Sequence, residues 1–127
     1  MIGKVLCPDN CGMDIQQRLK DFVKDVEADM STLLGQPTQL DVSSGARCPK
    51  YNATIPGSIA GDAHTLGLAL DVFVDTSTPD GRAFAGALIS VLGKRGVQRF
   101  GDGIVNHNYL HFDLADTLPT PRLWGYK

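Results

Sequence analysis

The feature that most constrains the fold is a helical repeat of apolar residues in the first third of the chain. Apolar side chains recur at steps of three and four between residues 15 and 34, which places them on one face of a helix. Asp14 suits the N-cap, Gln17 completes a capping-box pattern, and Gly35 with Pro37 ends the helix. The predicted apolar face consists of Ile15, Leu19, Phe22, Val23, Val26, Met30, Leu33 and Leu34.

Composition indicates one loop-rich domain spanning residues 1–127. The 14 glycines and 7 prolines argue against a helical bundle, and the net charge of −2 is spread along the chain without a basic stripe. No segment approaches the roughly 18 apolar residues of a membrane span, and the first residues lack a hydrophobic signal core. We therefore expect no nucleic-acid partner, no membrane span, no signal peptide and a monomer, with the cellular location left open.

The rest of the chain predicts short strands and a second helix. Leu40–Ser44 is β-like, residues 52–67 form a long ordered loop, and Leu68–Val74 is the strongest strand candidate. A helix from Pro79 ends near Gly93 or Gly96 and buries Phe84, Ala87, Leu88, Val91 and Leu92. Two more strands, Val97–Phe100 and Leu110–Leu114, flank a turn at Gly101-Asp102-Gly103. The predicted class is α+β: a small antiparallel sheet with both helices covering one side.

The three cysteines, Cys7, Cys11 and Cys48, do not form an evident disulfide framework. Cys7-x3-Cys11 followed by Gly12 looks like half of a zinc knuckle, but the fourth ligand is missing. Free thiols that lie near each other, one disulfide and a structural metal all remain open.

Histidines beside acids suggest a metal site. Asp71 lies in the middle of the predicted strand, where a carboxylate is costly to bury unless it is paired or bound to a metal. His64 precedes it at the end of the long loop, and His111 shares a face of the last strand with Asp113. Two imidazoles and one carboxylate leave a fourth position open, which is typical of a catalytic zinc site.

Three motifs in this order resemble the zinc D-alanyl-D-alanine peptidase family, which shares its fold with the hedgehog signalling domain. Residues 44–49 read Ser-Gly-Ala-Arg-Cys-Pro, residues 64–71 read His-Thr-Leu-Gly-Leu-Ala-Leu-Asp, and residues 110–113 read Leu-His-Phe-Asp. The phage and prophage branch also tends to carry a Cys-x-x-Cys-Gly-like element, to which residues 7–12 are similar. The resemblance covers roughly residues 7–124.

The resemblance implies a Zn²⁺ site with three ligands, His64, Asp71 and His111. It also implies that Arg47 holds substrate oxygen and stabilises the developing oxyanion.

The residue that moves the catalytic proton is not fixed by the resemblance. Several branches carry an acid where Asn108 stands, and an amide cannot act as a base. His107, one residue away, fits a proton-transfer role, and an exposed loop histidine is its alternative. Asp113 is the second candidate, with orientation of His111 as its alternative. Tyr109 could contact substrate or simply pack, and Trp124 is expected to dock back on the core.

These features together predict a zinc-dependent peptidase that hydrolyses peptide bonds in peptidoglycan stem peptides. D-Ala-D-Ala carboxypeptidase and endopeptidase activity both remain open. The alternatives are a zinc-containing cell-wall-binding module without turnover and a phage structural protein. The family resemblance, not the residues themselves, suggests a phage-encoded protein that acts on the cell wall.

Overall fold

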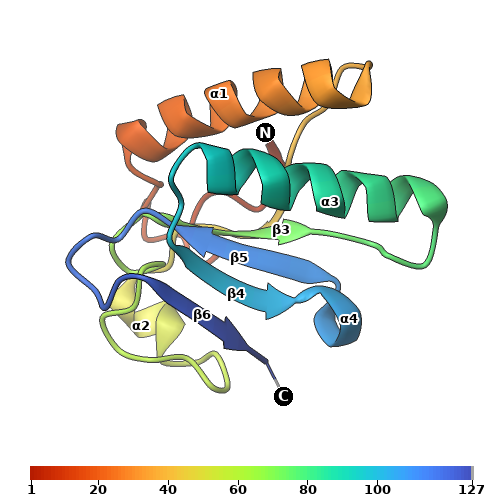
Figure 1. Ribbon diagram of the computed structural model, residues 1–127. Helices are drawn as coiled ribbons and strands as arrows, with labels where there is room; N and C mark the ends of the chain where they lie inside the picture. The colour runs from red at the N-terminus through yellow and green to blue at the C-terminus, as the bar shows by residue number, and fades with distance from the viewer. Residues whose placement is uncertain (127) are drawn as a thin grey trace.

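The computed structural model describes residues 1–126, which form a six-stranded sheet with the helices arranged as in Figure 1. The strand order is β1-β2-β3-β5-β4-β6. The strands are β1 (Ile2–Gly3), β2 (Asp41–Ser44), β3 (Ala69–Phe73), β4 (Arg99–Gly103), β5 (Tyr109–Asp113) and β6 (Arg122–Gly125). The helices are α1 (Gln17–Leu34), α2 (Pro49–Asn52), α3 (Pro79–Lys94) and α4 (Ile104–His107).

The two long helices, α1 and α3, lie over the same face of the sheet (Figure 1), as the sequence predicted. They pack against each other, and their apolar side chains form the main core with those of β2, β3 and β5. The largest fully buried side chains in this layer include Leu19, Met30, Leu88 and Phe112. No helix within residues 1–126 is long and apolar enough to cross a membrane.

The sheet is mixed rather than purely antiparallel, which corrects one part of the predicted fold class. The central pairs β2·β3, β3·β5 and β4·β5 are antiparallel, but β1 pairs parallel with β2 and β6 pairs parallel with β4. Both exceptions are mostly exposed edge strands, whereas four consecutive residues of β3 are buried. The fold is therefore mixed α/β with an open sheet whose centre is antiparallel.

The start of α1 differs from the predicted N-cap. The helix begins at Gln17 with Gln16 at the N-cap, and no side chain caps it. Asp14 lies before the helix, where it accepts the backbone N–H of Ile15 at 2.7 Å and pairs with Lys20. The predicted apolar face is otherwise buried or half-buried, except that Leu33 is 56% exposed at the last turn.

The predicted Gly101-Asp102-Gly103 turn is wrong, because these residues continue β4. The chain reverses in the short helix α4, which ends on Asn108 in the left-handed conformation (φ 57°). β3 and β5 agree with the sequence, with Leu70, Val72 and Leu110 facing the helices.

Candidate metal centre

The sheet register builds the site on the face opposite α1 and α3. Ser44 of β2 pairs with Asp71 of β3, which pairs with His111 of β5. His111 pairs in turn with Gly101 of β4, and Gly101 pairs with Trp124 of β6. Because side chains alternate between the two faces of a strand, this row presents the chemically active groups together.

Three predicted ligands converge in this row. Asp71 Oδ1 lies 2.9 Å from His111 Nδ1 and 3.3 Å from His64 Nε2. One ligand atom from each residue lies within 4.8 Å of the others, and all three residues are buried. The structure therefore brings together the three residues that the sequence selected, in a group that could hold a metal ion.

Hydrogen bonds orient both imidazoles toward Asp71. His64 Nδ1 lies 2.7 Å from the carbonyl oxygen of Gly45, and because a carbonyl only accepts, Nδ1 donates and Nε2 would be the atom that binds a metal. His111 Nε2 lies 2.7 Å from Asp113 Oδ2, so with a metal bound Nε2 would keep the ring proton and Nδ1 would offer its lone pair to the ion. Each ring thus presents a ligand atom to the same point.

Asp113 is the hydrogen-bond partner that orients the His111 ring. Its side chain is 0% exposed, and Oδ1 accepts hydrogen bonds from Arg99 Nε at 2.6 Å and from the backbone N–H of Ala115 at 3.1 Å. With Oδ2 on His111, both oxygens are occupied and shielded from solvent. The geometry favours the orienting role, which the sequence left as the alternative to proton transfer. Sequence reasoning missed Arg99, whose one signal was a cation inside the short predicted strand Val97–Phe100.

The electrostatics keep both carboxylates ionised. Burial raises the pKa of Asp71, but hydrogen bonds from His111 and His64 outweigh it, so this pKa lies far below its ordinary value. Burial also raises the pKa of Asp113, and its hydrogen bond with His111 again outweighs it. Burial lowers the pKa of His111, but the hydrogen bonds with Asp113 and Asp71 raise it by more, so the pKa lies above its ordinary value. Buried anionic oxygens of this kind favour a bound cation.

Arg47 lies beside the ligands with its guanidinium fixed on three sides. Nε donates to Ser44 Oγ at 3.0 Å, Nη1 to Asn52 Oδ1 at 3.2 Å, and Nη2 to Asp71 Oδ2 at 3.4 Å. Since a guanidinium has five N–H donors, these contacts leave two uncommitted. The side chain is 11% exposed, so those donors belong to a fixed and partly shielded group. Asn52, which the sequence did not select, is buried and is one of the groups that hold Arg47.

Aromatic rings line the C-terminal side of the site. The ring centroids of Tyr109 and Tyr126 lie 5.0 Å apart, and the His107 ring lies 6.0 Å and 6.2 Å from them. Burial and the charge of Asp71 raise the pKa of both tyrosines, which indicates that both phenols feel that carboxylate. Trp124 docks back as predicted, but on the metal-site face, with its ring centroid 5.0 Å from that of His111. Sequence reasoning missed Tyr126 because nothing indicated that the tail forms β6.

The remaining sequence candidates are not members of the His64-Asp71-His111 group. His107 is exposed at the end of α4, and its neighbour Asn108 is exposed as well. The three cysteines form a second group that could hold a metal ion, with their sulfur atoms within 4.8 Å of one another.

Comparison of the chain with protein-family models, with curated proteins and with solved structures found no match. The resemblance to zinc D-alanyl-D-alanine peptidases therefore stays an inference from the three motifs.

Proposed function

We propose that the protein is a zinc-dependent peptidase that hydrolyses peptide bonds in peptidoglycan stem peptides. The observation that carries the proposal is the convergence of His64 Nε2, Asp71 Oδ1 and His111 Nδ1 beside the fixed guanidinium of Arg47. Three ligands that leave an open coordination position, beside a cation that can bind an oxyanion, are suited to metal-assisted hydrolysis of an amide.

The donor set fits zinc. Two neutral imidazoles and one carboxylate are common zinc ligands, and three protein ligands leave a coordination position for water or substrate. His64, Asp71 and His111 would hold the ion, and Asp113 and Gly45 would fix the two imidazole tautomers. When bound, zinc supplies Lewis-acid polarisation of a carbonyl group and makes water a nucleophile at neutral pH.

Arg47 binds and orients the substrate. Its two uncommitted N–H donors match a peptide carbonyl oxygen, on which negative charge develops during attack, or a terminal carboxylate. The contacts with Ser44, Asn52 and Asp71 hold the guanidinium in place before substrate arrives, so little rotamer entropy is lost on binding. If Arg47 binds a terminal carboxylate, the enzyme acts as a D-Ala-D-Ala carboxypeptidase, whereas binding of an internal carbonyl makes it an endopeptidase.

The proton is moved at the aromatic side of the site. Asn108 cannot accept a proton at neutral pH, and Asp113 is shielded beneath His111. His107 lies against Tyr109 and Tyr126, and an imidazole is a group that can donate a proton to a leaving amine. Tyr109 is the substrate-contacting neighbour in this arrangement.

One observation favours a second function, a zinc-containing cell-wall-binding or phage structural module without turnover. The side chain at position 108 is an exposed amide where the resemblance expects an acid. Such a module would keep the metal and Arg47 for binding alone.

A muropeptide digest followed by mass spectrometry tests both functions. The wild-type protein is expected to release D-Ala or to cut a stem-peptide bond, and a chelator or His64→Ala is expected to abolish the cleavage. Arg47→Lys keeps the charge but loses the planar fork, so it should retain zinc and lose most activity. Zinc-loaded protein that sediments with insoluble peptidoglycan but cleaves no bond would replace the peptidase with the binding module.

A further inference from the structure

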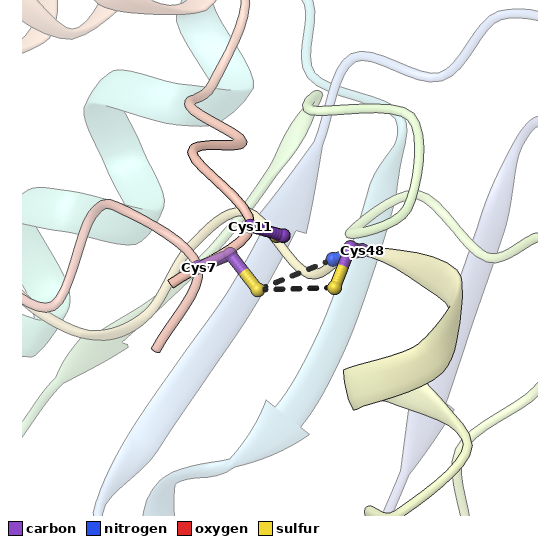
Figure 2. A group of neighbouring side chains, drawn as sticks. All are labelled: Cys7, Cys11 and Cys48. Atoms are coloured by element: carbon purple, nitrogen blue, oxygen red, sulfur yellow. Dashed lines mark hydrogen bonds between the residues drawn. The ribbon is translucent and has the colours of Figure 1, made fainter. Parts of the chain in front are cut away.

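A second cluster of metal-ligating side chains lies outside the His-Asp site. Cys7 and Cys11 come from the segment after β1, and Cys48 directly precedes α2, so the cluster joins segments about 40 residues apart in sequence (Figure 2). None of the three thiols is in a disulfide. We propose that Cys7, Cys11, Cys48 and Asp9 form a structural zinc site.

Two distances between donor atoms of the cluster are close to those of a tetrahedral zinc centre. Thiolates about 2.3 Å from a tetrahedral zinc lie about 3.8 Å from each other, and a carboxylate oxygen on the same ion lies about 3.5 Å from each sulfur. Cys7 Sγ and Cys48 Sγ are 3.5 Å apart, and Asp9 Oδ2 lies 3.7 Å from Cys48 Sγ. The three sulfurs lie within 4.8 Å of one another. Small shifts of these side chains around an ion would complete the geometry.

The backbone of residues 7–13 forms a closed loop that brings the proposed ligands of this segment together. The N–H of Cys7 donates to the carbonyl of Met13 at 2.9 Å and closes the loop that carries Cys7, Asp9 and Cys11. Asn10 and Gly12 have positive φ values of 55° and 78°, which turn the chain between the ligands.

A backbone N–H group also points at a sulfur atom of the cluster. The N–H of Cys48 points at Cys7 Sγ at 3.3 Å, and Figure 2 shows this contact beside the contact between the two sulfurs. Amide donors of this kind stabilise a thiolate that binds metal.

The donor set selects zinc over harder cations. Three soft thiolates disfavour Ca²⁺ and Mg²⁺, which take oxygen ligands, whereas zinc with three sulfurs and one oxygen keeps its preferred four-coordinate geometry. Four protein ligands leave no open position, so this site is structural rather than catalytic.

The proposed ion fastens the N-terminal segment to the loop that carries Arg47. Cys48 follows Arg47 directly, and the N–H of Ala46 donates to the carbonyl of Val5 at 2.9 Å. Gly45 lies so close to Val5 that an added Cβ would lie 2.4 Å from its carbonyl oxygen. The proposed zinc ion would therefore stabilise a place where the backbones of these two chain segments are in direct contact.

Zinc analysis of protein purified under reducing conditions tests the proposal. We expect two zinc ions per wild-type chain, one for each of the two groups. Cys11→Ser changes an exposed residue and should lose one ion, and Asp9→Asn should weaken the same site. His64→Ala should lose the other ion, so failure of the peptidase site stays distinguishable from failure of the cysteine site. Asp116→Asn, which alters an exposed carboxylate elsewhere, is the control and should keep both ions.

Cobalt substitution gives a readout that depends on sulfur ligation. The wild-type protein and His64→Ala should both show sulfur-to-cobalt charge-transfer absorption, and Cys11→Ser should show much less. Absence of that absorption in the wild-type protein would overturn the proposal even if Cys11→Ser failed to fold. So would zinc content that Cys11→Ser leaves unchanged, or a Cys7–Cys48 disulfide found by peptide mapping of the reduced preparation.

Discussion

The replacement Asp113→Asn tests whether the buried carboxylate fixes the tautomer of a metal ligand. Asp113 Oδ1 faces two donors, Arg99 Nε and the N–H of Ala115, whereas Oδ2 faces His111 Nε2. In the variant, the amide oxygen must stay beside the two donors, so the amide NH₂ group turns toward His111. Nε2 then accepts a hydrogen bond, and the ring proton moves to Nδ1, the atom that faces Asp71. The variant thus removes the lone pair that a metal requires, without removing any ligand.

The expected loss of zinc affinity is about 10–100-fold, the usual effect of altering a group that orients a metal-bound histidine. This corresponds to about 1.4–2.7 kcal/mol. The zinc-free variant should also lose stability, because Arg99 is buried and its ion pair with Asp113 becomes a hydrogen bond from the charged guanidinium to an uncharged amide oxygen. Breaking a buried ion pair by removing one partner costs about 3–5 kcal/mol, and the amide recovers part of that through its oxygen.

The affinity is measured by competition with a chelator in the Cys11→Ser background, so that only the His-Asp site is titrated. Denaturant unfolding of the zinc-free proteins gives the stability difference. Asp116→Asn in the same background is the matched control, since its carboxylate is 76% exposed and lies 3.8 Å from Arg18. Wild-type zinc affinity in a folded Asp113→Asn variant would refute the tautomer argument.

Three further predictions concern packing and pH. Gly101→Ala should destabilise the protein by about 1–3 kcal/mol and weaken zinc binding, because its Cβ would lie 2.8 Å from Trp124 Nε1 and 2.9 Å from His111 Cβ. Gly125→Ala in the adjacent strand, where an added Cβ meets nothing within 4 Å, should leave both measurements unchanged. Leu88→Ala, in the core between α3 and the sheet, should cost about 2–5 kcal/mol in denaturant unfolding and leave the zinc affinity of the folded protein unchanged. In the presence of a chelator, the stabilising effect of His111 should be fully present below about pH 6.5 and should be lost as the pH rises through its raised pKa. Melting curves at several pH values measure this dependence, and His111→Gln should remove it.

The parts of the fold that the sequence predicted are those with a buried apolar face. Leu19 and Met30 repeat at helical spacing, and Leu70 and Val72 lie on either side of Asp71 in the strand. The buried faces of α1 and β3 require apolar residues at these positions, so the sequence shows the pattern of each element. The same pattern revealed Asp71 as a carboxylate that needed partners, which is why the metal-ligand group could be predicted.

The parts that were missed lack such a pattern. Ile2 and Leu123 in the edge strands are exposed, so nothing in their surroundings distinguishes a strand from a loop. Glycine is typical of turns, so Gly101 was predicted to lie in one. Its place in β4 depends on its pairing with His111 and Trp124, and the local sequence contains no sign of that pairing. The partner of Arg99 likewise depends on which strand lies next to which.

The metal-ligand geometry also depends on how the long loop between β2 and β3 is held. Its two ends are tied together, because the N–H of Arg47 donates to the carbonyl of His64 at 3.2 Å and His64 Nδ1 donates to the carbonyl of Gly45. Farther along, the carbonyl of Gly67 accepts the N–H of Gln16 at 2.8 Å, which anchors the loop to the start of α1. Ordering a loop residue costs about 1–2 kcal/mol of backbone entropy, so a site on an unanchored loop would lose that amount from its metal affinity for every residue it orders. Here protein contacts offset the cost before any ion binds, and His64 is held where Asp71 and His111 already lie.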